Sequence, residues 1–147
     1  MNNKIIIRVY GLFFNSPDEI MVTDEFQLDT PMTKFPGGGL EFGEGPADCL
    51  RREIREEMNG QPIEIIEHFY TTDYYQPGMF RINSQIICIY YIAKFIEPIS
   101  FRISGRKFDF PEMINGAQSF RYVKLKDLNE ILTFPTDKKV AELLAKK

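Results

Sequence analysis

Three glutamates in the first half of the chain have the spacing of a single helix face. Glu53, Glu56 and Glu57 stand at positions i, i+3 and i+4, so their side chains are neighbours if the segment is helical. Carboxylates this close repel each other. Their oxygens are also suitable ligands for hard divalent cations such as Mg²⁺ or Mn²⁺. The triplet therefore indicates either a divalent-metal site or a solvated, glutamate-rich helix face.

A glycine-rich stretch precedes the three glutamates. Gly37, Gly38 and Gly39 can bring backbone carbonyls and amides close to a metal ion or a phosphate, because glycine has no Cβ. The same stretch is also typical of a flexible turn. No Gly-Lys-Ser or Gly-Lys-Thr sequence follows, which excludes a P-loop. Glu44 stands at the expected start of the helix, where its carboxylate can accept backbone amides near the positive end of the helix dipole.

The net charge of −3 is concentrated in this part of the chain. Residues 38–60 carry six acidic and three basic side chains, and the other acids are balanced by 15 Lys and Arg. A charge this small argues for neither a nucleic-acid nor a membrane partner. The acidic segment is therefore the feature that needs a functional explanation.

The elements that position these residues can also be predicted. A helix is expected over residues 45–59, because Pro46 suits the first helical position and Asn59 or Gly60 suits a left-handed end. Its apolar face should pack on a sheet and consists of Ala47, Leu50, Ile54 and Met58. Strands are expected over residues 4–14, 20–28, 63–72, 86–95 and 119–125. Loops are expected over 29–32, 34–39, 73–83 and 97–118, and further helices over 127–132 and 137–145.

Composition and length limit the class of protein. The 147 residues are 44% hydrophobic and 27% charged, which excludes a disordered, collagen-like or coiled-coil chain. We expect a single α+β domain over residues 1–147. No apolar run approaches the ~18 residues of a membrane span, and no signal segment is apparent. Cys49 and Cys88 lack a metal-type spacing, so a reducing cytoplasm is expected.

Residues 38–60 together resemble the Nudix box. The family pattern is glycine, five residues, glutamate, seven residues, then Arg-Glu-apolar-x-Glu-Glu-x-Gly-apolar. The chain reads Gly38, five residues, Glu44, seven residues, then Arg52-Glu53-Ile54-Arg55-Glu56-Glu57-Met58-Asn59-Gly60. The last glycine of the pattern is Asn59 here, and asparagine is the residue that best replaces glycine in a left-handed cap. The preceding Lys34-Phe35-Pro36-Gly37-Gly38 also resembles the entry to the family's box.

The resemblance implies a Nudix-type α/β/α sandwich with a mixed sheet and a loop-helix-loop metal site. It implies that the metal is held by Glu53, Glu56 and Glu57, with the carbonyl of Gly37 or Gly38 as a further ligand. Arg52 would hold a ligand carboxylate by a charged hydrogen bond, and Glu44 would tie the loop to the helix. The general base varies within the family, and the candidates here are Glu56, Glu57, Glu97 and Glu112.

The activity implied by the resemblance is Mg²⁺-dependent hydrolysis of the pyrophosphate bond of a nucleoside diphosphate linked to another group, with Mn²⁺ as an alternative. Triphosphates, ADP-ribose and nucleotide sugars all present such a bond, so the partner is a small nucleotide derivative. Homodimers are frequent in the family. A Nudix domain that only senses its ligand is the alternative, although such domains usually lack the glutamates. An isomerase on this scaffold would need additional Cys and His.

Aromatic and basic residues gather in the expected loop at 73–83. Tyr74, Tyr75 and Phe80 could stack on a base, and Arg81 could contact a phosphate. Alternatively, these aromatics belong to a hairpin tip that packs on the sheet or on a second copy of the chain. His68, the only histidine, fits a strand pattern better than an active site.

Overall fold

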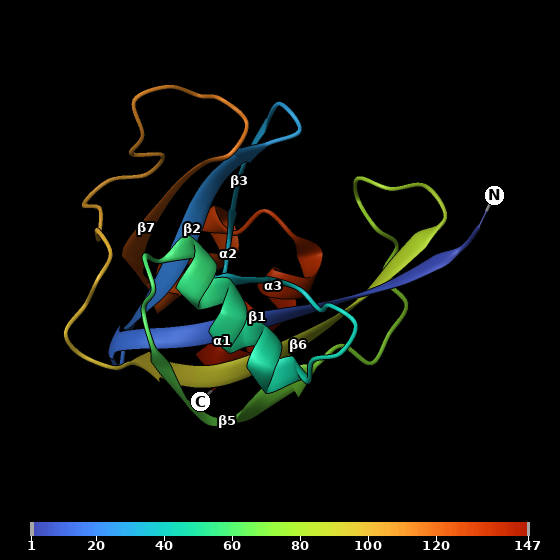
Figure 1. Cartoon of the computed structure of the whole chain (residues 1–147), viewed down its shortest axis with the longest axis horizontal. Coiled ribbons are helices and arrows are strands. Elements are labelled where there is room, and N and C mark those ends of the chain that lie inside the picture. The colour runs from blue at the N-terminus through green and yellow to red at the C-terminus, as the bar shows by residue number, and fades with distance from the viewer. Residues whose placement is uncertain (1, 147) are drawn as a thin grey trace.

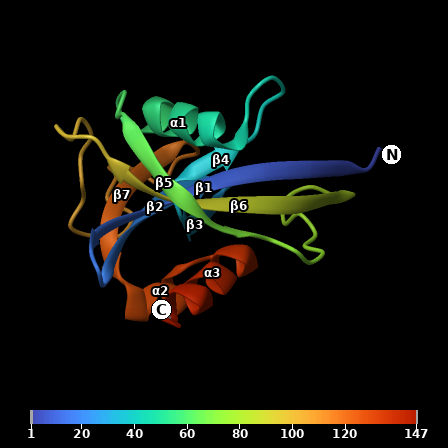
Figure 2. The same ribbon diagram turned by 90° about the horizontal axis from the view of Figure 1, so that it is seen from below.

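Helices cover both faces of a mixed sheet in the computed structural model, which describes residues 2–146 (Figures 1 and 2). One layer is α1 (Pro46–Glu57). The other holds α2 (Leu128–Ile131) and α3 (Pro135–Ala145), preceded by the 3₁₀ turn η1 (Leu125–Asp127). The α+β sandwich with a mixed sheet is thereby confirmed.

Seven strands make up the sheet within the described residues. They are β1 (Lys4–Ser16), β2 (Glu19–Gln27), β3 (Thr30–Lys34), β4 (Gly37–Gly39), β5 (Ile63–Thr71), β6 (Ser84–Phe95) and β7 (Ala117–Lys124). The order is β3-β2-β1-β6-β5, with β4 paired to β1 and β7 paired to β2. The long β1–β6 pair is parallel, and the other pairs are antiparallel.

The sheet is divided because β1 and β2 pair only beside the turn that joins them. Their register covers Phe14 with Ile20 and Ser16 with Glu19. Beyond that point β2, β3 and β7 diverge from β1, β4, β5 and β6 (Figure 1). The divergence leaves side chains of β1 and β2 facing a common hollow, which is described below.

The prediction of loops over 29–32 and 34–39 was wrong, because β3 and β4 occupy most of these residues. A tight turn at Leu28 and Asp29, whose φ angles are 50° and 57°, returns the chain onto β2 as a two-residue hairpin turn does. Three glycines have little intrinsic strand preference, but β4 pairs with β1. A Cβ on Gly37 would lie 2.0 Å from the carbonyl oxygen of Val9, so this close pairing requires glycine.

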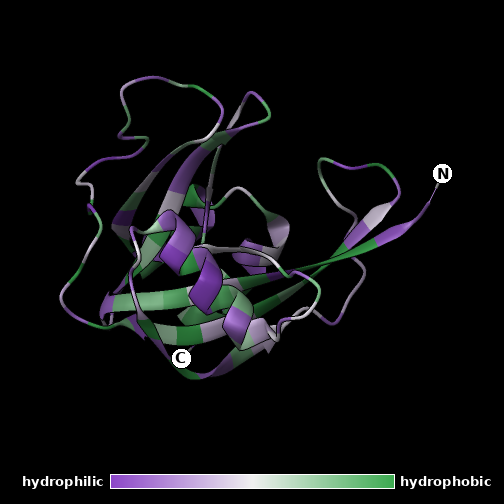
Figure 3. Ribbon diagram, in the orientation of Figure 1, coloured by the Kyte–Doolittle hydropathy of each residue, from purple (hydrophilic) through white to green (hydrophobic). Residues whose placement is uncertain are grey.

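The apolar face of α1 packs on the sheet as predicted. Leu50, Ile54 and Met58 are fully buried, and they share a cluster with Val9 and Phe13 of β1. Figure 3 shows the hydrophilic outer side of α1 above the hydrophobic strands. A second cluster lies under α2 and α3. No helix among residues 2–146 is both long and apolar enough to cross a membrane.

Asp24 organises the half of the sheet formed by β2, β3 and β7. Its carboxylate is fully buried and accepts two hydrogen bonds from the Arg121 guanidinium, at 2.7 and 3.2 Å. It also accepts the Thr33 hydroxyl at 2.7 Å and the backbone N–H of Phe108 at 3.0 Å. One side chain thus joins three strands to the loop at 97–118, which is irregular as predicted.

Replacing Arg121 by methionine should therefore leave a buried carboxylate without its cation. We expect the free energy of unfolding in urea to fall by about 3–5 kcal/mol. The control is Lys124→Met, which breaks an exposed ion pair with Asp18 and should cost less than about 1 kcal/mol. Equal losses in the two variants would show that Asp24 does not anchor the loop.

Candidate active site

Local signals mark both ends of α1, the helix that carries the three glutamates. The backbone N–H of Gly45 donates to the Asp48 carboxylate at 3.1 Å, directly before Pro46 begins the helix. At the other end Asn59 and Gly60 have φ angles of 50° and 78°. Both therefore adopt the left-handed conformation expected at a helix end.

Arg52 is the centre of an ion-pair network on α1. Its guanidinium donates two hydrogen bonds to Glu44, at 2.8 and 2.9 Å, and one to the carbonyl of Gly39 at 3.0 Å. It also pairs with Glu53 and Glu56, both at 3.1 Å. The bidentate contact holds the pKa of the Glu44 carboxyl down at about 2. Arg52 thus joins the glycine strand, the loop before the helix and the helix itself.

Glu53 lies directly against the backbone of β4. A Cβ on Gly38 would lie 2.4 Å from the Glu53 carboxyl carbon, which is closer than real contacts allow. Only glycine at residue 38 leaves room for the carboxylate in its present place. A carboxylate and a backbone strand are thereby brought side by side at the expected metal site.

Glu57 lies in a polar cluster that extends beyond the box. The Gln118 amide donates to Glu57 and to Glu25, at 3.0 Å in each case. Glu25 is buried and pairs with Lys34 at 3.0 Å, and Lys34 donates to the carbonyl of Gly37 at 3.3 Å. Burial raises the pKa of the Glu57 carboxyl to about 7, and the nearby Glu25 and Glu53 carboxylates add to the increase.

The donor set suits a hard divalent cation. Glu53 and Glu57 are close enough to affect each other's charge, and the missing Cβ at Gly38 lets the Glu53 carboxylate lie against the strand backbone. The Gly37 carbonyl accepts a hydrogen bond from Lys34, and the Gly38 carbonyl accepts one from the Cys49 thiol, so either carbonyl could serve as the backbone ligand. Glu56 is turned toward Arg52, and within residues 2–146 no three His, Cys, Asp or Glu side chains are gathered around one point. Glu56 would therefore rotate away from Arg52 to join a metal.

Other candidate residues are not brought to this cluster. Glu97 and Glu112 are exposed, and neither has a hydrogen bond or ion pair with a box residue. His68 is exposed and shares a hydrogen bond with Thr71. Cys49 lies on the buried side of α1, and burial raises the pKa of its thiol to about 12. This thiol is therefore a packing group and not a nucleophile.

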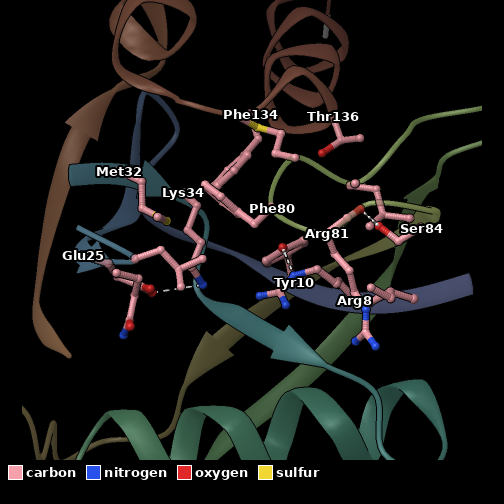
Figure 4. A pocket seen from close by; sticks show the side chains of 16 residues that line it. Arg8, Tyr10, Glu25, Met32, Lys34, Phe80, Arg81, Ser84, Phe134 and Thr136 are labelled. Atoms are coloured by element: carbon pink, nitrogen blue, oxygen red, sulfur yellow. Dashed lines mark hydrogen bonds and ion pairs between the residues drawn. The ribbon is translucent and has the colours of Figure 1, made fainter. Parts of the chain in front are cut away.

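A cavity of about 290 Å³ lies between the sheet and the start of α3 (Figure 4). Arg8 and Tyr10 of β1 line it. Glu25 and Lys34, which belong to the polar cluster around Glu57, line it as well. No carboxylate in the described part of the chain lies within ion-pair distance of the Arg8 guanidinium, which donates to the Tyr10 hydroxyl. The cavity therefore combines positive charge with aromatic surface.

Loop residues 73–83 meet this cavity only in part. Phe80 and Arg81 line it, and the Phe80 ring meets the Phe134 ring edge-on at 6.2 Å between centroids. Tyr75 lines a neighbouring hollow instead, and Tyr74 lines neither. The four residues expected to bind substrate are thus divided between different places.

Sequence reasoning missed Arg8, Glu25 and Gln118 as site residues. Glu25 and Gln118 are directly opposite each other in the β2–β7 register, although 93 residues separate them. Alternation along β2 suggests that Glu25 shares a face with Thr23, but it does not identify that face as part of the site. The sequence identified Lys34 only as the residue before Phe-Pro-Gly-Gly and did not predict its ion pair with Glu25.

The chain is similar to known proteins in sequence and in fold. A model of the NUDIX domain matches residues 5–144. The chain belongs to the Nudix family. An RNA pyrophosphohydrolase from a Nitratiruptor species is 28% identical over 142 residues, covering 90% of this chain and 86% of the relative. An 8-oxo-dGTP diphosphatase from Haemophilus influenzae is 30% identical over 93 residues, covering 58% of this chain and 68% of the relative.

The solved structure of the E. coli ORF135 protein shares the fold of this Nudix protein, with a TM-score of 0.72 at 16% identity. The similarity covers 98% of this chain and 91% of that one. Family membership and the two relatives identify the chain as a hydrolase that acts on acid anhydrides.

Replacing Gly38 by alanine should displace the Glu53 carboxylate from β4. We expect the affinity for Mn²⁺, measured by calorimetry, to fall at least about tenfold, because a misplaced carboxylate loses its ligand geometry. Gly105→Ala is the matched control, since a Cβ there meets nothing within 4 Å. Unchanged Mn²⁺ affinity in Gly38→Ala would argue against a site beside this glycine.

The half-buried Glu57 should make the metal-free protein less stable as the pH rises. The folded state keeps a proton up to a pKa of about 7, whereas the unfolded chain releases it near 4.5. The free energy of unfolding should therefore fall between pH 4.5 and 7, by on the order of 1–3 kcal/mol. Urea unfolding in EDTA at pH 5 and 8 measures this change.

Glu57→Gln is the comparison, because it removes the Glu57 carboxyl and keeps that of Asp137. Burial raises the pKa of Asp137 to about 6. The variant should lose less stability between the two pH values than the wild type. Identical pH dependence in both proteins would contradict a raised pKa at Glu57.

Proposed function

We propose that this Nudix hydrolase cleaves the pyrophosphate bond of a nucleotide derivative with the help of Mg²⁺ or Mn²⁺. The observation that carries the proposal is the cluster of Glu53, Glu57 and Gly38, linked through Gln118 and Glu25 to a cationic, aromatic cavity. Glu53, Glu56 and Glu57 would hold the cation together with the carbonyl of Gly37 or Gly38. When bound, a divalent cation neutralises phosphate charge and lowers the pKa of a coordinated water.

The cavity suits the nucleoside part of such a substrate. Phe80 and Phe134 offer aromatic surface for a flat base. Arg8 and Arg81 offer guanidinium groups that pair with no carboxylate among residues 2–146, and guanidinium groups bind phosphate oxygens well. The relatives named for RNA and for 8-oxo-dGTP support a nucleotide as the substrate class.

Proton transfer is assigned to a box carboxylate. A water oxygen forms a new bond to phosphorus while the bridging P–O bond breaks, and the water proton passes to a carboxylate oxygen. Glu57 is the candidate, because the Gln118 amide links its carboxylate to Glu25 in the wall of the cavity. Arg52 keeps the neighbouring carboxylates in place and compensates their charge.

The two buried thiols and the absence of a disulfide between them suit a reducing compartment, so a cytoplasmic location remains part of the proposal. A homodimer also remains a prediction.

A panel of nucleotides tests the function directly. Purified protein is incubated with each compound in Mg²⁺, in Mn²⁺ and in EDTA, and products are identified by mass. We expect metal-dependent cleavage of the pyrophosphate bond in at least one compound class. A compound that raises the melting temperature without being cleaved would support the alternative, a Nudix domain that only senses its ligand.

Glu57→Gln tests whether this carboxylate takes part in the reaction, as a metal ligand or as the base. We expect kcat to fall at least about 100-fold, the usual contribution of a positioned base, while the protein remains folded. Glu97→Gln is the matched control and should retain wild-type kcat. The opposite result, with only Glu97→Gln impaired, would transfer the role to the loop at 97–118.

A further inference from the structure

A separate hollow, of about 280 Å³, lies at the other end of the Glu57 cluster. Glu57 and Asn59 line it near the end of α1, and Gln118 lines it from β7. Ser100 and Arg102 line it from the loop at 97–118. None of the residues that line this hollow also lines the cavity proposed for the nucleoside. The hollow is therefore a distinct space beside the expected metal site.

The Gln118 amide forms the boundary between the cavity and this hollow. It donates to Glu25, which lines the cavity, and to Glu57, which lines the hollow, at 3.0 Å in each case. With a nucleoside in the cavity and its pyrophosphate held at Glu57, the phosphate group beyond the broken bond would reach the hollow. The residues that the loop presents there are therefore relevant to the reaction.

The first part of the loop is anchored to the end of α1 by two amide side chains. The side-chain carbonyl of the fully buried Gln61 accepts the Ser100 N–H at 2.7 Å and the Ser100 hydroxyl at 3.0 Å. The Gln61 amide donates to the Ile96 carbonyl at 2.7 Å. The Asn59 amide donates to the Ser100 carbonyl at 2.6 Å. Asn59 stands where the Nudix box has a glycine, which could not make this contact.

A second anchor ties the loop to β7. The Ser104 N–H donates to the Phe120 carbonyl at 2.7 Å, and the Asp109 N–H donates to the Ser119 hydroxyl at 3.2 Å. Figures 1 and 2 show the loop on the same side of the molecule as the C-terminal end of α1. Arg102 lies between the two anchors, so the backbone that carries it is fixed beside Glu57.

Arg102 supplies positive charge to the wall of the hollow, which no other basic side chain in residues 2–146 lines. Its side chain is 71% exposed, and its guanidinium makes one ion pair among these residues, with Asp109 at 2.6 Å. Asp109 also pairs with Arg106 at 3.0 Å, so two guanidinium groups share one carboxylate. The remaining positive charge and N–H groups suit a phosphate, which a guanidinium can bind with two parallel hydrogen bonds.

We infer that Arg102 is a further catalytic residue, which donates hydrogen bonds to the substrate phosphate that lies beyond the broken bond. This inference rests on the proposed hydrolysis of a pyrophosphate bond. Breaking the bridging P–O bond increases the negative charge on the phosphate groups of the two products. A guanidinium placed beside one of these groups stabilises that charge as it develops. The loop at 97–118 would thus contribute a cation that the box helix does not provide, because Arg52 is occupied by its own carboxylates.

The test compares Arg102→Gln with Arg106→Gln. Arg106 is the matched control, because it pairs with the same Asp109 carboxylate, is 79% exposed and does not line the hollow. We measure kcat/KM for a nucleotide that the wild type cleaves, and the affinity for imidodiphosphate, a pyrophosphate analogue with a nitrogen bridge, by calorimetry in Mg²⁺. Arg102→Gln should lower both at least about tenfold, the loss expected for a charge-assisted contact with phosphate. Arg106→Gln should leave both unchanged, and Arg102→Lys should lose less than Arg102→Gln.

Equal losses in Arg102→Gln and Arg106→Gln would show that both residues act only by holding Asp109 and the loop, and would overturn the inference. Unchanged values in Arg102→Gln would overturn it as well and leave the proposed hydrolysis intact. Urea unfolding should give the same stability for the two variants, since each removes one exposed ion pair with Asp109. Failure of the wild type to cleave any nucleotide would instead overturn the proposed hydrolysis. Weaker imidodiphosphate binding in Arg102→Gln alone would then still support a phosphate contact at the hollow.

Discussion

The close contact between β4 and α1 is the constraint on which the site depends. A backbone strand passes so near the helix that Gly38 has no room for a side chain beside Glu53. The contact is held on one side by pairing of β4 with β1. It is held on the other by the hydrogen bond from Arg52 to the Gly39 carbonyl. Any change that separates strand and helix would also move the Glu53 carboxylate away from the backbone of Gly38.

Charge compensation explains how so many carboxylates can be placed together. Arg52 pairs with Glu44, Glu53 and Glu56 on the outer side of the cluster. Lys34 pairs with Glu25 on the inner side, and within residues 2–146 Glu57 accepts one hydrogen bond, from the Gln118 amide. Glu57 is thus the least compensated carboxylate of the cluster, and burial raises its pKa. A cation bound there would relieve an unfavourable concentration of charge, which links metal binding to stability.

The divided sheet joins this cluster to the substrate cavity. If β1 and β2 paired along their whole length, the hollow between them would close. They separate after the turn, so Arg8 of β1 and Glu25 of β2 line one cavity. Asp24 and Arg121 keep the outer half of the sheet in place. The same separation therefore provides room for a ligand and a polar connection to Glu57.

The sequence by itself determined α1, because its signals are local. The spacing of Leu50, Ile54 and Met58 predicted the buried face, and Pro46, Asn59 and Gly60 predicted the ends. The same local spacing placed Glu53, Glu56 and Glu57 together and carried the resemblance to the Nudix box. Tertiary structure decided that three glycines form a strand, since pairing with β1 overrides their weak strand preference. It also decided that Glu25 and Gln118 meet Glu57, because that contact depends on the register of strands far apart in the chain.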